Sequence, residues 1–256
     1  MKDMKDTNKK YVGLFTKLIT NPALYLMSKN ANMDFIFYDC EHGVIGKEKL
    51  HDLILFGNNV GVPTFVRVAE LSRKEVSQVL DCGATGIMVP MIELKEEAEK
   101  LVSWSKYPPI GQRSYSSGAN TNYGPSGGHK ENMERLNQQT VTIAQIETLK
   151  GVEHCEEIAS IPGLDAIIVG PVDLSISLGN VGNIMDPNEL EAIERVIQAC
   201  KQNDLMFGII GSEKILEHFK EDVNYWISAT DYNIIRDGIV NAVNRFKDVY
   251  GGDSNE

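Results

Sequence analysis

The sequence has no long hydrophobic run. No stretch approaches the roughly 18 consecutive apolar residues that a membrane span needs. The first ten residues, MKDMKDTNKK, lack the apolar core of a secretory signal peptide. We therefore expect a cytoplasmic protein with no membrane partner.

Cysteine is scarce and positive charge is not in excess. The four cysteines, at positions 40, 82, 155 and 200, form no CxxC pair and show no zinc-ligand spacing, so we expect reduced, mostly buried thiols. The 25 Lys and Arg residues against 36 Asp and Glu residues give a formal net charge of -11. A surface this acidic repels nucleic-acid phosphates and anionic membranes, so neither is an expected partner, although a local cluster of arginine and metal can still bind a small anion.

What the sequence does contain is a regular alternation of short apolar and longer amphipathic segments. Parallel strands covered by helices give this pattern, because both faces of each strand are buried. The predicted strands are residues 11–15, 34–38, 63–68, 86–90, 141–146, 165–169, 205–210 and 224–229, and the predicted helices are residues 47–59, 73–80, 94–104, 188–201 and 231–250. Ser72 and Asp186-Pro187 are typical helix-start signals.

Eight strands alternating with helices predict the α/β class and a single-domain (β/α)8 TIM barrel over residues 10–250. We expect residues 1–9 to be a flexible N-terminus and residues 251–256 a flexible tail. A doubly wound open sheet is the alternative, but no GxGxxG follows the first strand. Residues 107–129, rich in glycine and proline, interrupt the alternation and are typical of a lid, a subunit contact or a disordered segment.

Two carboxylates stand at the ends of predicted strands, where catalytic residues of such barrels lie. Glu147 closes the fifth strand, and Asp173 follows the sixth in the turn GPVDLS. Two buried acids on neighbouring strands would repel each other unless a cation lies between them. Oxygen ligands suit Mg²⁺ or Mn²⁺, with open positions for a bidentate oxo-acid. Alternatively, each acid is a helix cap or an arginine partner.

His42 follows the second predicted strand. A neutral imidazole there is suited to act as a general base, although a structural histidine is an equal alternative. Asp39 and Glu41 are close enough in sequence to orient it.

Arg67 closes the third predicted strand. Its guanidinium is suited to a carboxylate or a developing enolate oxygen, and it can also form a buried ion pair with Asp39 or Glu147. Arg113 lies in the glycine- and proline-rich segment, where we favour a structural role. None of the predicted strand ends supplies an obvious lysine for Schiff-base chemistry.

Several segments together resemble the HpcH/HpaI class II aldolases, metal-dependent lyases of 2-oxo acids that include the 2-keto-3-deoxy sugar-acid aldolases. The matching stretches are DFIFYDCEHG, PTFVRV, QVLDCGATGIMVPMIELKEEAE, YPPIGQRS, AQIET and GLDAIIVGPVDLSISLG. They follow the family order, and QIET combined with GPxDLSxSLG is the most specific part.

The resemblance implies a role for several residues. Metal ligands would be Glu147 and Asp173, binding Mg²⁺ or Mn²⁺, with Co²⁺ also possible. His42 would be the general base, and Arg67 would be the arginine that stabilises the enolate. Asp81 would be the acid that raises the basicity of His42, although periodicity alone makes this position an ordinary helix end. Substrate contacts would be Gln145, the backbone of Val172, and Asp173.

The resemblance also implies an activity and an assembly. The expected reaction is cleavage of a small 4-hydroxy-2-oxo acid to pyruvate and an aldehyde through a metal-stabilised enolate, with His42 taking the 4-hydroxyl proton. The family is typically hexameric with its last helix exchanged between subunits, and the helix over residues 231–250 permits a homo-oligomer of that kind.

Departures from the family leave the second substrate open. The first strand ends VGLFTK, where many relatives carry Trp after GL. The last strand reads NYWISATDYN, where relatives commonly have FVAVGVD. The segment SSGANTNYGPSGG lacks an arginine that some relatives carry. One alternative is therefore a condensing enzyme that joins acetyl-CoA to oxaloacetate, as a citrate synthase does. Another is a non-enzymatic binder, which predicts loss of the chemical residues, whereas all of them are present.

Overall fold

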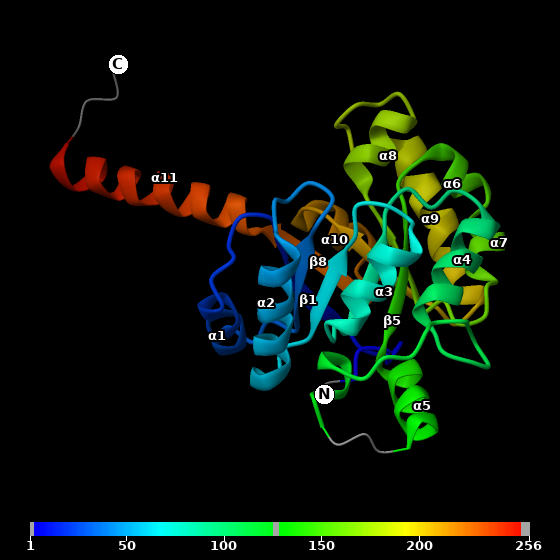
Figure 1. The fold of residues 1–256 in the computed structure, drawn as a ribbon. Helices are drawn as coiled ribbons and strands as arrows, with labels where there is room; N and C mark the ends of the chain where they lie inside the picture. Colours follow the sequence, from blue (N-terminus) through cyan, green and yellow to red (C-terminus); the bar gives the residue numbers. More distant parts are fainter. Residues whose placement is uncertain (1–2, 125–127, 252–256) are drawn as a thin grey trace.

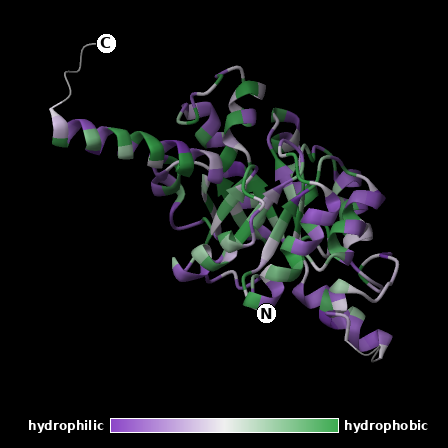
Figure 2. Cartoon of the chain, turned by 60° about the vertical axis from the view of Figure 1, so that its left-hand side comes forward, coloured by the Kyte–Doolittle hydropathy of each residue, from purple (hydrophilic) through white to green (hydrophobic). Residues whose placement is uncertain are grey.

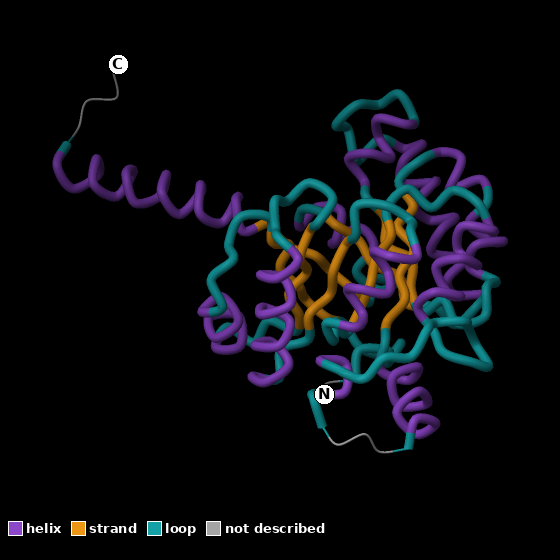
Figure 3. The backbone as a smooth tube through the Cα atoms, viewed as in Figure 1, coloured by secondary structure: helices purple, strands orange, loops and turns teal. Residues whose placement is uncertain are grey.

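The computed structural model describes residues 3–124 and 128–251. Eight parallel strands follow one another around a closed barrel, and the last pairs with the first (Figure 3). They are β1 (Tyr11–Thr16), β2 (Phe35–Asp39), β3 (Thr64–Arg67), β4 (Gly86–Val89), β5 (Val141–Ile146), β6 (Ala166–Val169), β7 (Met206–Ile210) and β8 (Tyr225–Thr230). Each predicted strand overlaps an observed one, so the (β/α)8 barrel is confirmed and the open sheet is wrong.

Helices surround the barrel, and the long last helix points away from it (Figure 1). They are α1 (Ala23–Asn30), α2 (Lys47–Val60), α3 (Arg73–Asp81), α4 (Lys95–Ser105), α5 (His129–Gln139), α6 (Leu149–Glu153), α7 (Cys155–Ala159), α8 (Pro171–Ser177), α9 (Pro187–Gln202), α10 (Glu213–Phe219) and α11 (Asp231–Tyr250). The Ser72 hydroxyl accepts a hydrogen bond from the Glu75 backbone amide at 3.2 Å, as its capping pattern predicts.

The core has two layers. Aliphatic side chains fill the space between strands and helices. Aromatic rings fill the inside of the barrel, where Phe35 and Phe65 stack at 4.9 Å and Tyr225 meets Phe35 edge-on at 5.8 Å. This interior is packed rather than hollow, as in other barrels of this type. Polar chemistry is therefore confined to the ends of the strands.

Residues 3–9, expected to be flexible, pack against the N-terminal end of the barrel. Met4 is buried with the interior aromatic rings, and its carbonyl accepts a hydrogen bond from the Tyr225 hydroxyl. The Lys5 ammonium lies 2.8 Å from the Asp165 carboxylate. Residues 1–2 and 252–256 of the expected flexible ends lie outside the described residues.

The glycine- and proline-rich segment also lies at the N-terminal end of the barrel. Its short 3-10 helix, η1 (Ala119–Thr121), is followed by residues 125–127, which lie outside the described residues. Arg113 anchors the segment, because its guanidinium donates to Asp81 at 2.7 Å and stacks over the Tyr107 ring at 4.7 Å. The structural role expected for Arg113 is therefore confirmed.

Two expectations from composition can be compared with the structure. All four cysteines are free thiols, with Cys155 and Cys200 buried and the other two half-buried. In the described part of the chain, none of the helices combines the length and hydrophobicity that a membrane span requires.

Helix α11 carries many exposed apolar side chains. Figure 2 shows this helix extending from the barrel, with hydrophobic and hydrophilic residues alternating along it. Its exposed residues include Ile235, Ile239, Val243, Phe246 and Tyr250, spaced so that they share one face of the helix. Only Asp231, at its first turn, is buried.

Candidate active site

The C-terminal ends of β2 and β3 bring together a buried ion pair. Asp39 and Arg67 are register partners in this parallel strand pair. The Arg67 Nε atom donates to Asp39 Oδ1 at 2.9 Å, and Nη2 donates to Oδ2 at 2.8 Å. Both side chains are buried, Asp39 completely. This two-pronged geometry fixes the plane of the guanidinium.

Burial opposes the charge of both partners, but their mutual attraction is stronger. For Asp39, desolvation is outweighed by the hydrogen bonds and charge of Arg67, so the pKa of the carboxyl lies below its ordinary value. For Arg67, desolvation is outweighed by Asp39, and the pKa of the guanidinium lies above its ordinary value. Both groups are therefore ionised at neutral pH.

The same pair organises the turn that carries His42. Asp39 Oδ1 accepts the backbone amides of Glu41 at 3.0 Å and His42 at 3.3 Å. The Glu41 carboxylate lies 3.1 Å from Arg67 Nη1 and 3.9 Å from His42 Nε2. The imidazole itself is 58% exposed. The structure thus places His42 at the rim of the site, with its backbone held by Asp39 and Glu41 beside its ring.

The network continues from Arg67 to the end of β5. Arg67 Nη1 donates to Gln145 Oε1 at 3.4 Å, and Gln145 Nε2 donates to Glu147 Oε2. The other oxygen of Glu147 accepts the Met91 backbone amide at 2.9 Å. Met91 has a φ of 55°, which is unusual for a residue with a side chain. Both oxygens of Glu147 are thereby oriented.

Glu147 lies in an unfavourable place for a charged acid. Burial raises the pKa of its carboxyl to about 7, the Met91 amide opposes that effect, and the negative charge of Asp173 adds to it. Asp173 lies exposed in the first turn of α8, just after Gly170. A Cβ atom at Gly170 would lie 2.8 Å from Glu147 Oε2, so this glycine allows the close approach of the two strand ends.

A divalent cation fits this pair of acids. A buried carboxylate, disfavoured by desolvation and by a second carboxylate, gains most from a nearby positive ion. Within residues 3–124 and 128–251, no group of three or more His, Cys, Asp or Glu side chains is placed to hold a metal ion. Two carboxylates with substrate and water completing the coordination match the oxygen-rich sites of Mg²⁺.

The strand ends therefore gather most of the predicted site residues at one end of the barrel: His42, Arg67, Gln145, Glu147, Val172 and Asp173. Val172 occupies the first turn of α8 and is exposed beside Asp173. The first amides of a helix have no partner within that helix, so the Val172 amide is available to a substrate oxygen.

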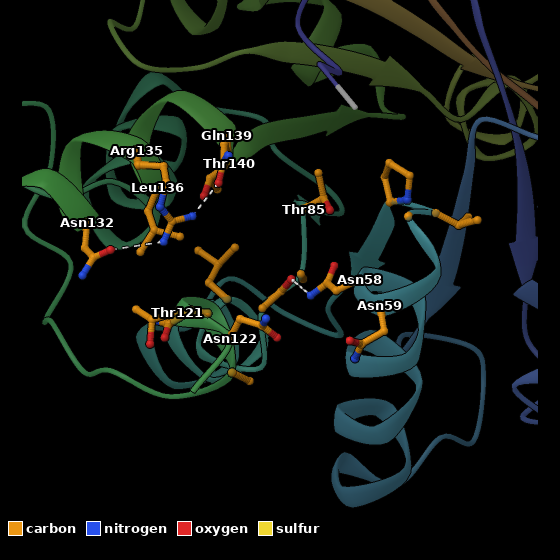
Figure 4. A pocket seen from close by; sticks show the side chains of 18 of the residues that line it. Asn58, Asn59, Thr85, Thr121, Asn122, Asn132, Arg135, Leu136, Gln139 and Thr140 are labelled. Atoms are coloured by element: carbon orange, nitrogen blue, oxygen red, sulfur yellow. Dashed lines mark hydrogen bonds between the residues drawn. The ribbon is translucent and has the colours of Figure 1, made fainter. Parts of the chain in front are cut away.

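Asp81 is not brought to this end. It is the last residue of α3, a few positions before β4 begins at Gly86, which places it at the N-terminal end of the barrel. Its partner there is Arg113. A cavity of about 450 Å³ lies at this end of the barrel (Figure 4). It is lined by Arg113, Thr85 and Arg135 among others, and is separate from the strand-end site.

Lys17 is a charged side chain near the site that the sequence analysis missed. The first strand was expected to end at residue 15, and no strand end offered an obvious lysine. The strand continues to Thr16, so Lys17 directly follows its C-terminal end. The Lys17 Nζ atom lies 3.5 Å from Asp39 Oδ2. Its position after an apolar strand was the available signal.

A closed (β/α)8 barrel whose strand ends gather a guanidinium, an imidazole and paired carboxylates defines an enzyme acting on small molecules. The HpcH/HpaI aldolase/citrate lyase family matches residues 12–229, so the chain belongs to this family, as its motifs predicted. It is an enzyme of the aldolase type.

Relatives with known names and structures support this assignment. The chain is 35% identical over 182 residues to the 2-dehydro-3,6-dideoxy-6-sulfogluconate aldolase of Pseudomonas putida, covering 71% of this chain and 70% of that one. It is similar to the crystal structure of an HpcH/HpaI aldolase from Desulfitobacterium hafniense DCB-2, with a TM-score of 0.89, 28% identity and 93% of each chain covered. It is also similar to the citrate synthase SbnG, with a TM-score of 0.85, 27% identity, and 95% of this chain and 96% of that one covered.

Proposed function

We propose that this protein is a divalent-metal-dependent aldolase that cleaves a 4-hydroxy-2-oxo acid to pyruvate and an aldehyde, and that also catalyses the reverse addition. The observation that carries the proposal is the pair of acids, Glu147 and Asp173, beside the buried guanidinium of Arg67. A bound cation, Mg²⁺ or Mn²⁺ by its oxygen ligands, with Co²⁺ also possible, would supply Lewis-acid stabilisation of negative charge on the 2-oxo acid.

Arg67 has the position and charge to stabilise the enolate. When the bond between C3 and C4 breaks, its electron pair moves toward the C2 oxygen, which becomes negative. Arg67 stays ionised through Asp39, and its orientation is fixed before the reaction, so little reorganisation is needed. Gln145 links Arg67 to Glu147 and is suited to contact the substrate carboxylate.

His42 is the proposed proton acceptor. Cleavage requires loss of the 4-hydroxyl proton as C4 becomes the carbonyl carbon of the aldehyde. The imidazole is exposed at the rim, where a water molecule can relay that proton. The enolate left by cleavage becomes pyruvate when its C3 carbon takes up a proton from solvent. In the addition direction C3 first loses that proton, and His42 returns its proton to the new alkoxide. The backbone amide of Val172 is proposed to bind the substrate carboxylate.

A homo-oligomer completes the proposal. Within one chain Asp81 lies at the opposite end of the barrel from His42, so a role for Asp81 beside this base requires a neighbouring subunit. The exposed apolar face of α11 is suited to pack against a second copy of the chain. A hexamer with exchanged last helices, as the family resemblance implies, would meet both needs. We further propose that the protein works in the cytoplasm.

The test is incubation of the purified protein with pyruvate and short aldehydes, with Mg²⁺ or Mn²⁺ added or removed by chelation. The proposal expects a 4-hydroxy-2-oxo acid that forms only with the metal, and its cleavage in the reverse assay. His42→Ala should lose both reactions while retaining the circular dichroism spectrum of the folded barrel. Formation of product at the same rate after chelation would refute the metal's role.

A second candidate is a condensing enzyme that joins acetyl-CoA to oxaloacetate. The similarity to the citrate synthase SbnG over nearly the full length favours it. Release of free thiol from acetyl-CoA in the presence of oxaloacetate, without any aldol product from pyruvate, would favour this candidate over the aldolase.

A further inference from the structure

We propose that Lys17 selects a carbonyl substrate that carries a carboxylate. In this inference, which rests on the proposed aldolase function, the ammonium binds the acid group of the aldehyde added to pyruvate. The natural 4-hydroxy-2-oxo acid would then be a diacid. The argument combines the fixed backbone of Lys17, its proximity to the His42 turn, and its charge.

The backbone of Lys17 is firmly anchored. The buried Asp231 carboxylate accepts the amides of Lys17 at 3.1 Å, Leu18 at 2.8 Å and Ile19 at 2.6 Å. Three amides bound by one carboxylate anchor the loop after β1 to the start of α11. The backbone of Lys17 is therefore more restrained than its side chain.

The anchored loop lies against the turn that carries the proposed base. A Cβ atom at Gly43 would lie 3.4 Å from the Lys17 Cα atom and 2.3 Å from the Asp39 carbonyl oxygen. Gly43 follows His42 directly, so the lysine and the imidazole project from adjoining segments. A substrate whose carbonyl faces His42 is therefore also within reach of the Lys17 side chain.

The ammonium of Lys17 is not required to neutralise Asp39. That carboxylate already accepts two hydrogen bonds from Arg67 and two from backbone amides. The contact of Lys17 with Asp39, at 3.5 Å, is longer than those of Arg67, and the lysine side chain is 35% exposed. A flexible lysine with one weak contact can turn toward an anion in the site.

Arg67 cannot bind the carboxylate of the aldehyde itself. It is 4% exposed and is committed to Asp39, Glu41 and Gln145. Apart from Lys17, Arg67 and His42, the other ionisable side chains described around the site are the acids Asp39, Glu41, Glu147 and Asp173, and the whole chain has a net charge of -11. An acidic aldehyde therefore needs a local positive charge, whereas a neutral aldehyde gains nothing from Lys17.

The experiment compares two aldehydes of similar size, glyoxylate and neutral glycolaldehyde, as partners for pyruvate with saturating Mg²⁺. The measured quantity is the ratio of their kcat/KM values in the wild type, Lys17→Gln and Lys17→Arg. Loss of one charge-assisted hydrogen bond predicts a fall of roughly 10- to 100-fold in that ratio for Lys17→Gln, mainly through the KM of glyoxylate. Lys17→Arg should retain most of the wild-type ratio.

The matched control is Lys49→Gln, an exposed lysine on α2 that should leave the ratio unchanged. An unchanged ratio in Lys17→Gln, or an equal loss toward both aldehydes, would overturn the inference, because a structural ion pair would affect both alike. Exchange of the pyruvate methyl protons with D₂O, followed by NMR without any aldehyde, separates the two proposals. Metal-dependent exchange with an unchanged ratio refutes only the role of Lys17, whereas absence of exchange refutes both.

Discussion

Replacing Asp39 by asparagine should strongly destabilise the protein, because it leaves Arg67 charged and buried. The asparagine carbonyl can still accept the amides of Glu41 and His42, so the turn keeps its acceptor. Its amino group, however, would face the Nη2 donor of Arg67 where Oδ2 now lies at 2.8 Å. The charge of the guanidinium would also lose its completely buried partner.

Removing one member of a buried ion pair costs about 3–5 kcal/mol. Glu41, 3.1 Å from Arg67 Nη1, remains as a second acidic neighbour. We therefore expect the lower end of that range, about 3 kcal/mol of unfolding free energy. For a protein of this size that corresponds to a fall in Tm of roughly 6–12 °C, measured by calorimetry.

A double-mutant cycle with Arg67→Met makes the argument specific. Removing both charges should cost less than the sum of the two single changes, with a coupling energy of about 1–3 kcal/mol. Asp52→Asn is the control, since its side chain is 73% exposed and the change should alter stability by less than about 0.5 kcal/mol. A loss below about 1 kcal/mol in Asp39→Asn, or strictly additive effects, would refute the reasoning.

Three further outcomes follow from the structure. A divalent cation at 100 times its Kd should raise the unfolding free energy by about 2.7 kcal/mol, and Glu147→Gln should abolish that thermal shift while Glu48→Gln retains it. Glu189 is fully buried, and burial raises the pKa of its carboxyl to about 7 from 4.5. The folded state therefore holds this proton more tightly, and stability falls as pH rises from about 4.5 through 7. After allowance for solvent screening, Glu189→Gln should be about 1–2 kcal/mol more stable than the wild type at pH 8 and equal to it near pH 4, by denaturant titration. Ile239→Glu with Phe246→Glu should lower the particle mass measured by light scattering, and an unchanged mass would exclude α11 from the subunit contact.

The barrel strands could be predicted because burial on both sides makes each one a continuous apolar run. Helix α5 was not predicted, since among its residues only Leu136 is buried and the helix shows little apolar periodicity. Helix α11 was predicted with its observed bounds, and in the structure Thr230 caps its start and Gly251 ends it with a positive φ of 62°. An element could thus be predicted where a local pattern of apolar residues marks it in the sequence.

The candidate site could be predicted as far as strand ends allow. Glu147 and Arg67 follow from that rule, and the contact of Arg67 with Asp39 was one of its expected alternatives. Lys17 was missed because the strand extends one residue further than its apolar run. The pairing of Asp81 with Arg113 joins residues 32 positions apart through a loop, and no local pattern encodes such a contact. Met91 contacts Glu147 through its backbone amide, so its residue type gives no indication of the contact.

The Asp231 carboxylate has a consequence for communication between subunits. It is the first residue of α11, and it also holds the three amides of the loop that carries Lys17. A tilt of this helix is therefore transmitted directly to the rim of the site through three hydrogen bonds. In an assembly built through α11, the docking of one subunit would set the loop geometry of another, so quaternary structure and substrate choice would be thermodynamically linked.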